Sequence, residues 1–76
     1  MEAILYTTPI CPWCYVEKRF LKKNKIEFEE IDVSKDMEAA KKMIDKSGRN
    51  AVPQTEINGK IIVGYNKEAL KKEFGL

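Results

Sequence analysis

Apolar positions along the chain alternate between short strand-like runs and longer segments with helical spacing. The run Ala3-Ile4-Leu5-Tyr6 is short and apolar throughout, and polar residues bound it, so it predicts a buried central strand. The next segment, about 12–24, has the spacing of an amphipathic helix, with Val16, Phe20 and Leu21 as its inner stripe. Its charged side chains are expected to face water: Glu17, Lys18, Lys22 and Lys23.

The middle of the chain predicts a second strand and a second helix. Residues 26–33 are β-branched and aromatic with charges between them, which favours a strand near a sheet edge. A helix over about 35–47 follows, capped by Ser34 or Asp36 and ended by Gly48. Its expected apolar face is Met37, Ala40 and Ile44, with Met43 beside them. The order strand, helix, strand, helix predicts a parallel strand pair with a right-handed crossover.

The last third predicts a hairpin and a terminal helix. Residues 54–57 and 60–63 flank Asn58-Gly59, which is the strongest short hairpin signal. Gly64 then turns the chain, and Asn66 can cap a helix over about 67–74. The full order is βαβαββα, which predicts an α/β fold with a four-stranded mixed sheet and helices on both faces. Residues 1–76 are expected to form one domain.

Composition and charge limit the cellular location and the classes of ligand that we expect for this protein. The chain has 76 residues, 43% of them hydrophobic and 34% charged, which is ordinary for a soluble globular domain. No apolar run approaches the ~20 residues of a membrane span, and no signal peptide is visible. We therefore expect a cytoplasmic protein that does not bind membranes. The net charge is only +2, without a long block of like charge, so nucleic-acid binding is not expected.

Both cysteines lie in Cys11-Pro12-Trp13-Cys14, between the first predicted strand and the first predicted helix. A Cys-x-x-Cys at such a junction predicts a dithiol redox site. The first sulfur would lie at a helix N-terminus, where unpaired N–H groups and the helix dipole favour an anionic thiolate. The second sulfur would lie one turn further in, more covered and less reactive. Pro12 suits the first helical position, where its missing N–H has no helical partner.

Two other interpretations of the motif are weaker. A purely structural disulfide would close a very short loop and constrain the unfolded chain little. A structural zinc site usually takes four Cys or His ligands, and this chain has two Cys and no His. A monomer therefore cannot complete such a site, although an intermolecular metal or iron–sulfur site remains open. In the cytosol, a Cys-x-x-Cys is more plausibly reactive than a permanent crosslink.

The chain resembles the glutaredoxins over nearly its whole length. The resemblance rests on Tyr6-Thr7 before the cysteines, Ser47-Gly48-Arg49, Val52-Pro53-Gln54, and Asn58-Gly59 before Gly64. It implies a thioredoxin-like fold and thiol–disulfide exchange, with Cys11 as nucleophile and Cys14 as resolving thiol. It also implies a cis Pro53 facing the dithiol, so that the backbone of Val52 can pair with an extended thiol peptide. From the residues alone, Pro53 is equally well a strand-entry proline.

The resemblance implies glutathione as a cosubstrate, with no tightly bound cofactor and no metal. Disulfide-bearing proteins are the expected partners of a monomer. The residues expected at the substrate or glutathione site are Pro12, Trp13, Arg49, Val52, Pro53, Gly64, Tyr65, Asn66 and Lys67.

The sequence also departs from the glutathione-binding pattern. Many glutaredoxins have a lysine where Thr8 stands, and acids for the γ-glutamyl ammonium where Asn66 and Lys67 stand. Gly64-Tyr65 instead resembles the Gly-aromatic pair of redoxins that thioredoxin reductase reduces and that supply ribonucleotide reductase. As a structural alternative, Tyr65 is a part-buried aromatic and Asn66 a helix cap.

A rival interpretation from another class is a binding module. In it, two chains would bridge an iron–sulfur cluster through Cys11 of each. Glutaredoxins that do this commonly have a different pair between the cysteines and a single cysteine, which counts against this interpretation here.

Overall fold

A computed structural model describes residues 3–76, and its elements follow the predicted order βαβαββα. The strands are β1 (Ala3–Thr7), β2 (Phe28–Asp32), β3 (Gln54–Ile57) and β4 (Lys60–Val63). The helices are α1 (Pro12–Lys23), α2 (Met37–Ser47) and α3 (Lys67–Phe74). None of these helices is long and apolar enough to cross a membrane.

The four strands form one mixed sheet in the order β2-β1-β3-β4. Strand β1 lies inside the sheet, parallel to β2 and antiparallel to β3, which confirms the predicted central strand and parallel strand pair. Strand β2 lies at an edge, as its charged sequence predicts. The hairpin between β3 and β4 turns through Asn58 and Gly59, whose φ angles of 52° and 75° suit a two-residue turn.

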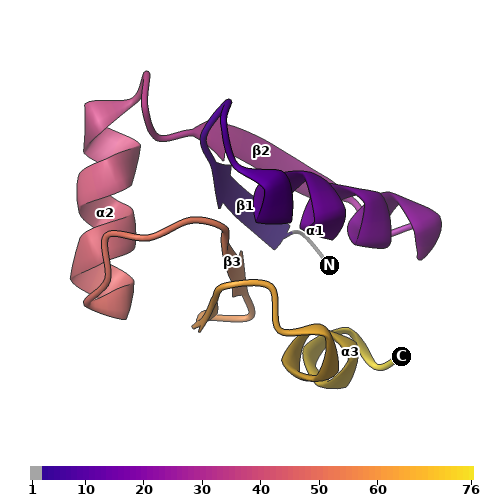
Figure 1. The fold of residues 1–76 in the computed structure, drawn as a ribbon. Helices are drawn as coiled ribbons and strands as arrows, with labels where there is room; N and C mark the ends of the chain where they lie inside the picture. The colour runs from indigo at the N-terminus through magenta and orange to yellow at the C-terminus, as the bar shows by residue number, and fades with distance from the viewer. Residues whose placement is uncertain (1–2) are drawn as a thin grey trace.

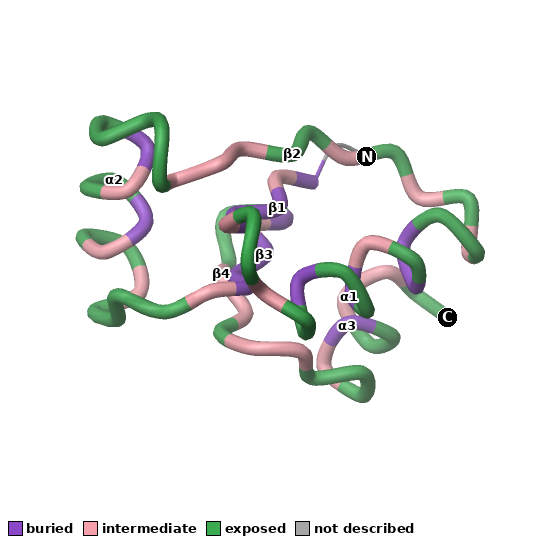
Figure 2. The backbone as a smooth tube through the Cα atoms, turned by 45° about the horizontal axis from the view of Figure 1, so that its top comes forward, coloured by how far each residue is buried: buried purple, intermediate pink, exposed green. Residues whose placement is uncertain are grey.

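Helices cover both faces of the sheet, as predicted. Helices α1 and α3 lie on one side and α2 on the other (Figures 1 and 2). Leu5 of β1 packs with Leu21 of α1 and Leu70 of α3. On the opposite face, Tyr6 of β1 packs with Met43 of α2. Since adjacent residues of a strand point to opposite faces, Leu5 and Tyr6 together join the two layers.

The helix ends use local polar groups. Helix α1 begins at Pro12, as predicted, and α2 is capped by Asp36, whose carboxylate accepts a hydrogen bond of 3.0 Å from Ala39 N. Ser34 is not the cap, because its N–H and hydroxyl donate to Asp32. Gly48 ends α2 with a φ of 73°, a left-handed conformation that favours glycine.

Three predicted orientations are wrong. Val16 is 38% exposed, although it was expected in the inner stripe of α1, and Glu17 is fully buried, although it was expected in water. Cys14, Glu17 and Leu21 follow the i, i+3, i+7 spacing of one helix face, and this face meets the sheet. Met37, expected on the apolar face of α2, is 79% exposed, because the buried face of α2 follows Ala39 and Met43 and Met37 lies off that face.

Candidate active site

The two cysteines lie at the junction between β1 and α1. Strand β1 ends at Thr7, and Cys11 forms the N-cap of α1 in an extended conformation. Cys14 lies in the first turn of the helix, 5.2 Å from Cys11 between Cα atoms, and a disulfide joins the two residues. The strand-to-helix junction therefore brings both sulfurs to the end of the sheet where β1 finishes.

The two sulfur atoms have different surroundings. Cys11 Sγ accepts a hydrogen bond of 3.1 Å from the backbone N–H of Cys14, and the Cys11 side chain is partly exposed. Cys14 is only 2% exposed. When the disulfide opens, the helix N-terminus can stabilise negative charge on Cys11, while Cys14 remains in the protein interior.

An aromatic stack lies beside the cysteines. The ring of Trp13 stacks on Tyr65, with centroids 5.9 Å apart and planes at 20°. Phe20 of α1 meets Tyr65 edge-on, with ring centroids 6.1 Å apart. Trp13 remains 61% exposed, so the stack presents an apolar surface next to Cys11. Both Trp13 and Tyr65 were predicted site residues, and Tyr65 is also the part-buried aromatic of the structural alternative.

The loop before β3 lies at the same end of the sheet. The Val52–Pro53 peptide is cis, as the resemblance implied, and Pro53 is buried. Gly64 N donates a hydrogen bond of 2.8 Å to the Pro53 carbonyl, which ties this loop to the segment leading into α3. Among the described residues, no hydrogen bond uses the backbone N–H or C=O of Val52.

The remaining predicted residues lie at the surface. Asn66 caps α3, with its side-chain oxygen accepting a hydrogen bond of 3.1 Å from Ala69 N. Lys67 is the first residue of α3, and Arg49 follows α2 with its carbonyl held by Gln54 Nε2 at 3.0 Å. Neither basic side chain forms an ion pair within residues 3–76. Neither Arg49 nor Lys67 lines the groove that borders both cysteines.

A polar groove of about 330 Å³ borders both cysteines on the β2 side. Glu30 accepts a hydrogen bond of 3.1 Å from the Thr7 hydroxyl and pairs with Lys18 Nζ at 2.9 Å. Asp32 lies on the same groove, and a hydrogen bond from Ser34 lowers the pKa of its carboxyl. The sequence analysis missed this groove. The groove forms because β1 pairs with β2 and because Lys18 lies on α1. No local sequence motif predicts either arrangement.

Glu17 is the second feature that the sequence analysis missed. Its side chain is fully buried, and burial raises the pKa of its carboxyl to about 8. The Thr55 hydroxyl donates a hydrogen bond to Oε2 of Glu17, while Oε1 has no partner in the described part of the protein. The spacing of Cys14, Glu17 and Leu21 along α1 is the sequence signal that could have placed Glu17 inside.

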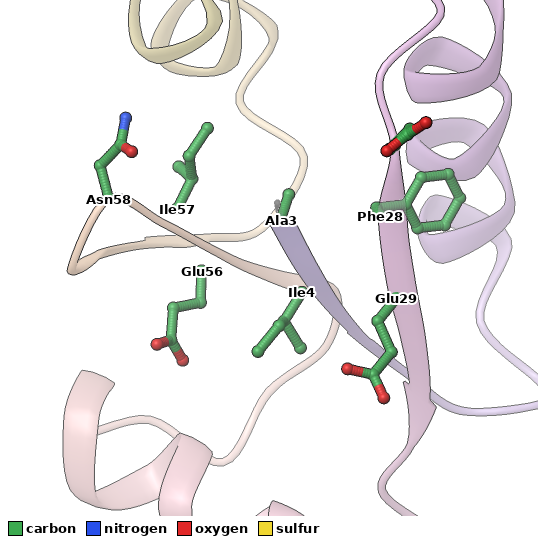
Figure 3. A pocket seen from close by; sticks show the side chains of 8 residues that line it. Ala3, Ile4, Phe28, Glu29, Glu56, Ile57 and Asn58 are labelled. Atoms are coloured by element: carbon green, nitrogen blue, oxygen red, sulfur yellow. The ribbon is translucent and has the colours of Figure 1, made fainter. Parts of the chain in front are cut away.

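A cavity of about 450 Å³ lies away from the dithiol site. It lies between the start of β1, the start of β2 and the end of β3, with Ala3, Phe28 and Ile57 on its wall (Figure 3). The cysteines follow the other end of β1. Within residues 3–76, no cluster of three or more His, Cys, Asp or Glu side chains could hold a metal ion.

Comparisons with known proteins agree with this geometry. A sequence model of the family described as "Glutaredoxin" matches residues 3–62. An uncharacterized glutaredoxin-like 8.6 kDa protein from the rubredoxin operon of Clostridium pasteurianum is 41% identical, over 90% of this chain and 91% of that protein. Glutaredoxin 3 of Escherichia coli strain K12 is 33% identical over 79% of this chain and 72% of its own.

A solved structure extends the likeness to the fold. The glutaredoxin (grx-1) of Archaeoglobus fulgidus superposes with a TM-score of 0.87 at 30% identity, covering 95% of this chain and 84% of its own. The mixed sheet, the helices on both faces and the Cys-x-x-Cys at the start of α1 are therefore those of a thioredoxin-like fold. This chain belongs to the glutaredoxin family of thiol–disulfide oxidoreductases.

Proposed function

We propose that Cys11 attacks the substrate disulfide and that Cys14 resolves the intermediate. The observation that supports these roles is the difference between the two sulfurs: Cys11 lies partly exposed at the helix N-terminus and Cys14 is buried. The Cys11 thiolate displaces one thiolate from the substrate and forms a mixed disulfide. The Cys14 thiolate then attacks Cys11 Sγ, releases the second substrate thiolate and leaves the Cys11–Cys14 disulfide.

The binding surface for an extended thiol is, in this proposal, the loop at Val52 and Pro53 together with the Trp13–Tyr65 stack. The backbone groups of Val52 have no partner among the described residues and can pair with a cysteinyl unit as an added strand would. Gly64 holds this loop through the Pro53 carbonyl. Arg49, Lys67 and the start of α3 supply positive charge for carboxylates.

Glutathione is the reductant we propose, held weakly. The acid that would pair with a γ-glutamyl ammonium is absent where Asn66 caps α3, and Lys67 beside it repels an ammonium. One missing exposed charge contact costs about 0–1 kcal/mol, so binding should be weakened and not abolished. We place this activity in the cytoplasm, in a monomer whose residues 1–76 act as one glutaredoxin-like domain, with disulfide-bearing proteins as the other substrates.

The second candidate is a redoxin that thioredoxin reductase reduces and that supplies ribonucleotide reductase. The exposed apolar surface around the dithiol favours it, because such a surface suits a protein partner. Ile10 is 92% exposed, and Trp13 and Tyr15 are each 61% exposed.

A pair of coupled assays distinguishes the two reductants. One contains glutathione with glutathione reductase and the other contains thioredoxin reductase, and both use the same disulfide substrate. We expect turnover with glutathione and a high Michaelis constant. Lys67→Asp should lower that constant by providing a partner for the ammonium, whereas Lys42→Asp, the same charge change on α2, should not. Turnover with thioredoxin reductase alone would replace the glutathione proposal with the second candidate.

The cysteine roles have their own test. Cys14→Ser should still remove glutathione from glutathionylated substrates, because that reaction needs one attacking thiol and free glutathione can complete the cycle. The same variant should lose the reduction of protein disulfides, because nothing releases the trapped intermediate. Full protein-disulfide activity in Cys14→Ser would contradict the assignment.

A further inference from the structure

Glu17 is a buried ionisable group that the proposed roles of Cys11 and Cys14 leave unexplained. It lies three residues after Cys14 on α1, and side chains with this spacing share one helix face on successive turns. Both residues are buried, at 2% and 0% exposure. The resolving cysteine and the carboxyl are therefore neighbours in the layer between α1 and the sheet.

The surroundings of Glu17 leave one of its oxygens available. Thr55 of β3 donates to Oε2, and Thr55 pairs across the sheet with Leu5 of β1. Leu5 of β1 packs with Leu21 of α1 and Leu70 of α3 in the same layer, so the surroundings of this layer are apolar. Within the described residues Oε1 has no hydrogen-bond partner. A buried oxygen without a hydrogen-bond partner destabilises the folded state. The cost falls if the oxygen carries a proton or forms a hydrogen bond during part of the reaction.

On the β2 side of Cys14, the polar groove carries four charged side chains. They are Lys18, Glu30, Asp32 and Lys35. Lys18 is paired with Glu30, and Asp32 is hydrogen-bonded to Ser34. Glu17 is the one carboxyl with an unpartnered buried oxygen among the residues described.

We propose that Glu17 takes the proton of the Cys14 thiol when Cys14 attacks the mixed disulfide on Cys11. The Cys14 S–H proton passes to the Glu17 carboxylate, directly or through one bridging group. The electron pair of the Cys14 thiolate forms the bond to Cys11 Sγ, and the pair of the broken mixed disulfide leaves with the substrate thiolate. Below about pH 8, Glu17 keeps this proton in the disulfide form. On reduction of the disulfide, the same proton returns to Cys14.

The role of Glu17 follows from the need for an acceptor for the Cys14 thiol proton. Cys14 must lose a proton to become a nucleophile, and its side chain is almost closed to water. A buried base matched to the operating pH is most effective for such a transfer. The pKa of Glu17, raised to about 8 by burial, lies in that range. The inference rests on the proposed role of Cys14 as the resolving thiol, and it holds whichever reductant resets the dithiol.

The first test uses the wild-type protein. The carboxyl carbons of its glutamates, labelled with carbon-13, are titrated by NMR in the disulfide and dithiol forms. In the disulfide form the Glu17 signal should titrate near pH 8. In the dithiol form its titration should move to higher pH, because the Cys11 thiolate and the Cys14 thiol now share the site. Identical titrations in the two forms would overturn the proposal.

The second test follows the resolution step itself. Reduced protein reacts with an aromatic disulfide whose thiol absorbs visible light, and stopped-flow absorbance separates the release of the first thiol, by Cys11, from that of the second, by Cys14. Glu17→Gln should slow the second release at least about tenfold at neutral pH and leave the first unchanged, in line with loss of a general base. The inflection near pH 8 in the second release should disappear.

Two further variants separate proton transfer from mere packing. Thr55→Val removes the donor to Oε2, so the inflection should remain and move to higher pH. Glu29→Gln, at an exposed carboxylate on β2, should match the wild type. A second release that keeps its wild-type rate and pH profile in Glu17→Gln would show that Glu17 is structural only.

Discussion

Trp13 and Tyr65 lie 52 residues apart in the sequence and stack with their ring centroids 5.9 Å apart. The stack joins the motif at the start of α1 to the segment that leads into α3. Because that segment also holds the Pro53 carbonyl through Gly64 N, the aromatic pair links three parts of the dithiol site.

The stack predicts a measurable coupling energy. A double-mutant cycle with Trp13→Leu and Tyr65→Leu should give a coupling of about 0.5–1.5 kcal/mol in the free energy of urea-induced unfolding. Tyr65→Phe should keep most of it, since the ring is retained and no hydrogen bond of its hydroxyl occurs in the described residues. Additive single-variant effects would mean that the two rings are neighbours without interaction.

The position of the cysteines predicts which thiol reacts first. After reduction, brief treatment with iodoacetamide at about pH 6 should label Cys11 much faster than Cys14, because the helix end favours the Cys11 thiolate and its side chain is accessible. Peptide mass spectrometry gives the two rates. The same treatment in strong denaturant is the control, and there the preference should vanish. Faster labelling of Cys14 in the folded protein would reverse the proposed roles.

Glu17 predicts how stability depends on pH. Burial raises its pKa from 4.5 to about 8, so between these values the folded protein holds a proton that the unfolded chain has lost. Stability of the disulfide form should therefore fall as pH rises through this window, by at most about 1.4 kcal/mol per pH unit. Glu17→Gln should flatten the dependence in urea unfolding between about pH 5 and about pH 8.

Glu56 does not obscure that measurement. A hydrogen bond from Lys46 lowers the pKa of Glu56 below 4.5, so its contribution is present above this pH and is lost only at lower pH. The two carboxyls thus act in different pH ranges and with opposite signs. Stability that is constant from about pH 5 to about pH 8 in the wild type would argue against a protonated Glu17.

The cap of α2 gives a simpler stability prediction. Asp36→Ala removes the oxygen that accepts from Ala39 N and should cost about 1 kcal/mol of unfolding free energy. Ser34→Ala is the matched control in the preceding turn, where Ser34 is exposed and bonds only to Asp32. It should change stability by less than about 0.5 kcal/mol. Equal losses in the two variants would show that the turn, and not the cap, stabilises this helix start.

The order of elements could be predicted because each has a local signal. The run at Ala3–Tyr6, the Asn58-Gly59 turn and the Gly48 terminus were all placed correctly. The cis Val52–Pro53 peptide came from family resemblance and not from the residues themselves. Glu17 was misplaced because hydrophobicity alone was used to choose the inner stripe of α1, and a carboxyl in a core breaks that rule.

The site was predicted where it is continuous in sequence and missed where the sheet assembles it. The cysteines share one motif, whereas the groove needs Lys18 of α1 to meet Glu30 of β2. That contact depends on the pairing of β1 with β2, which a single sequence does not specify residue by residue. Arg49 was predicted from the family resemblance and Lys67 as a departure from the family pattern, and the structure leaves both exposed at the surface.

The edge position of β2 has a consequence for how copies of this protein meet. Glu29 and Glu30 are exposed on that strand, whose outer backbone groups have no neighbouring strand. Two molecules approaching along this edge would bring their Glu29 carboxylates together, and the repulsion between them opposes growth of a continuous intermolecular sheet. Glu30 adds less to this repulsion because Lys18 already pairs with it.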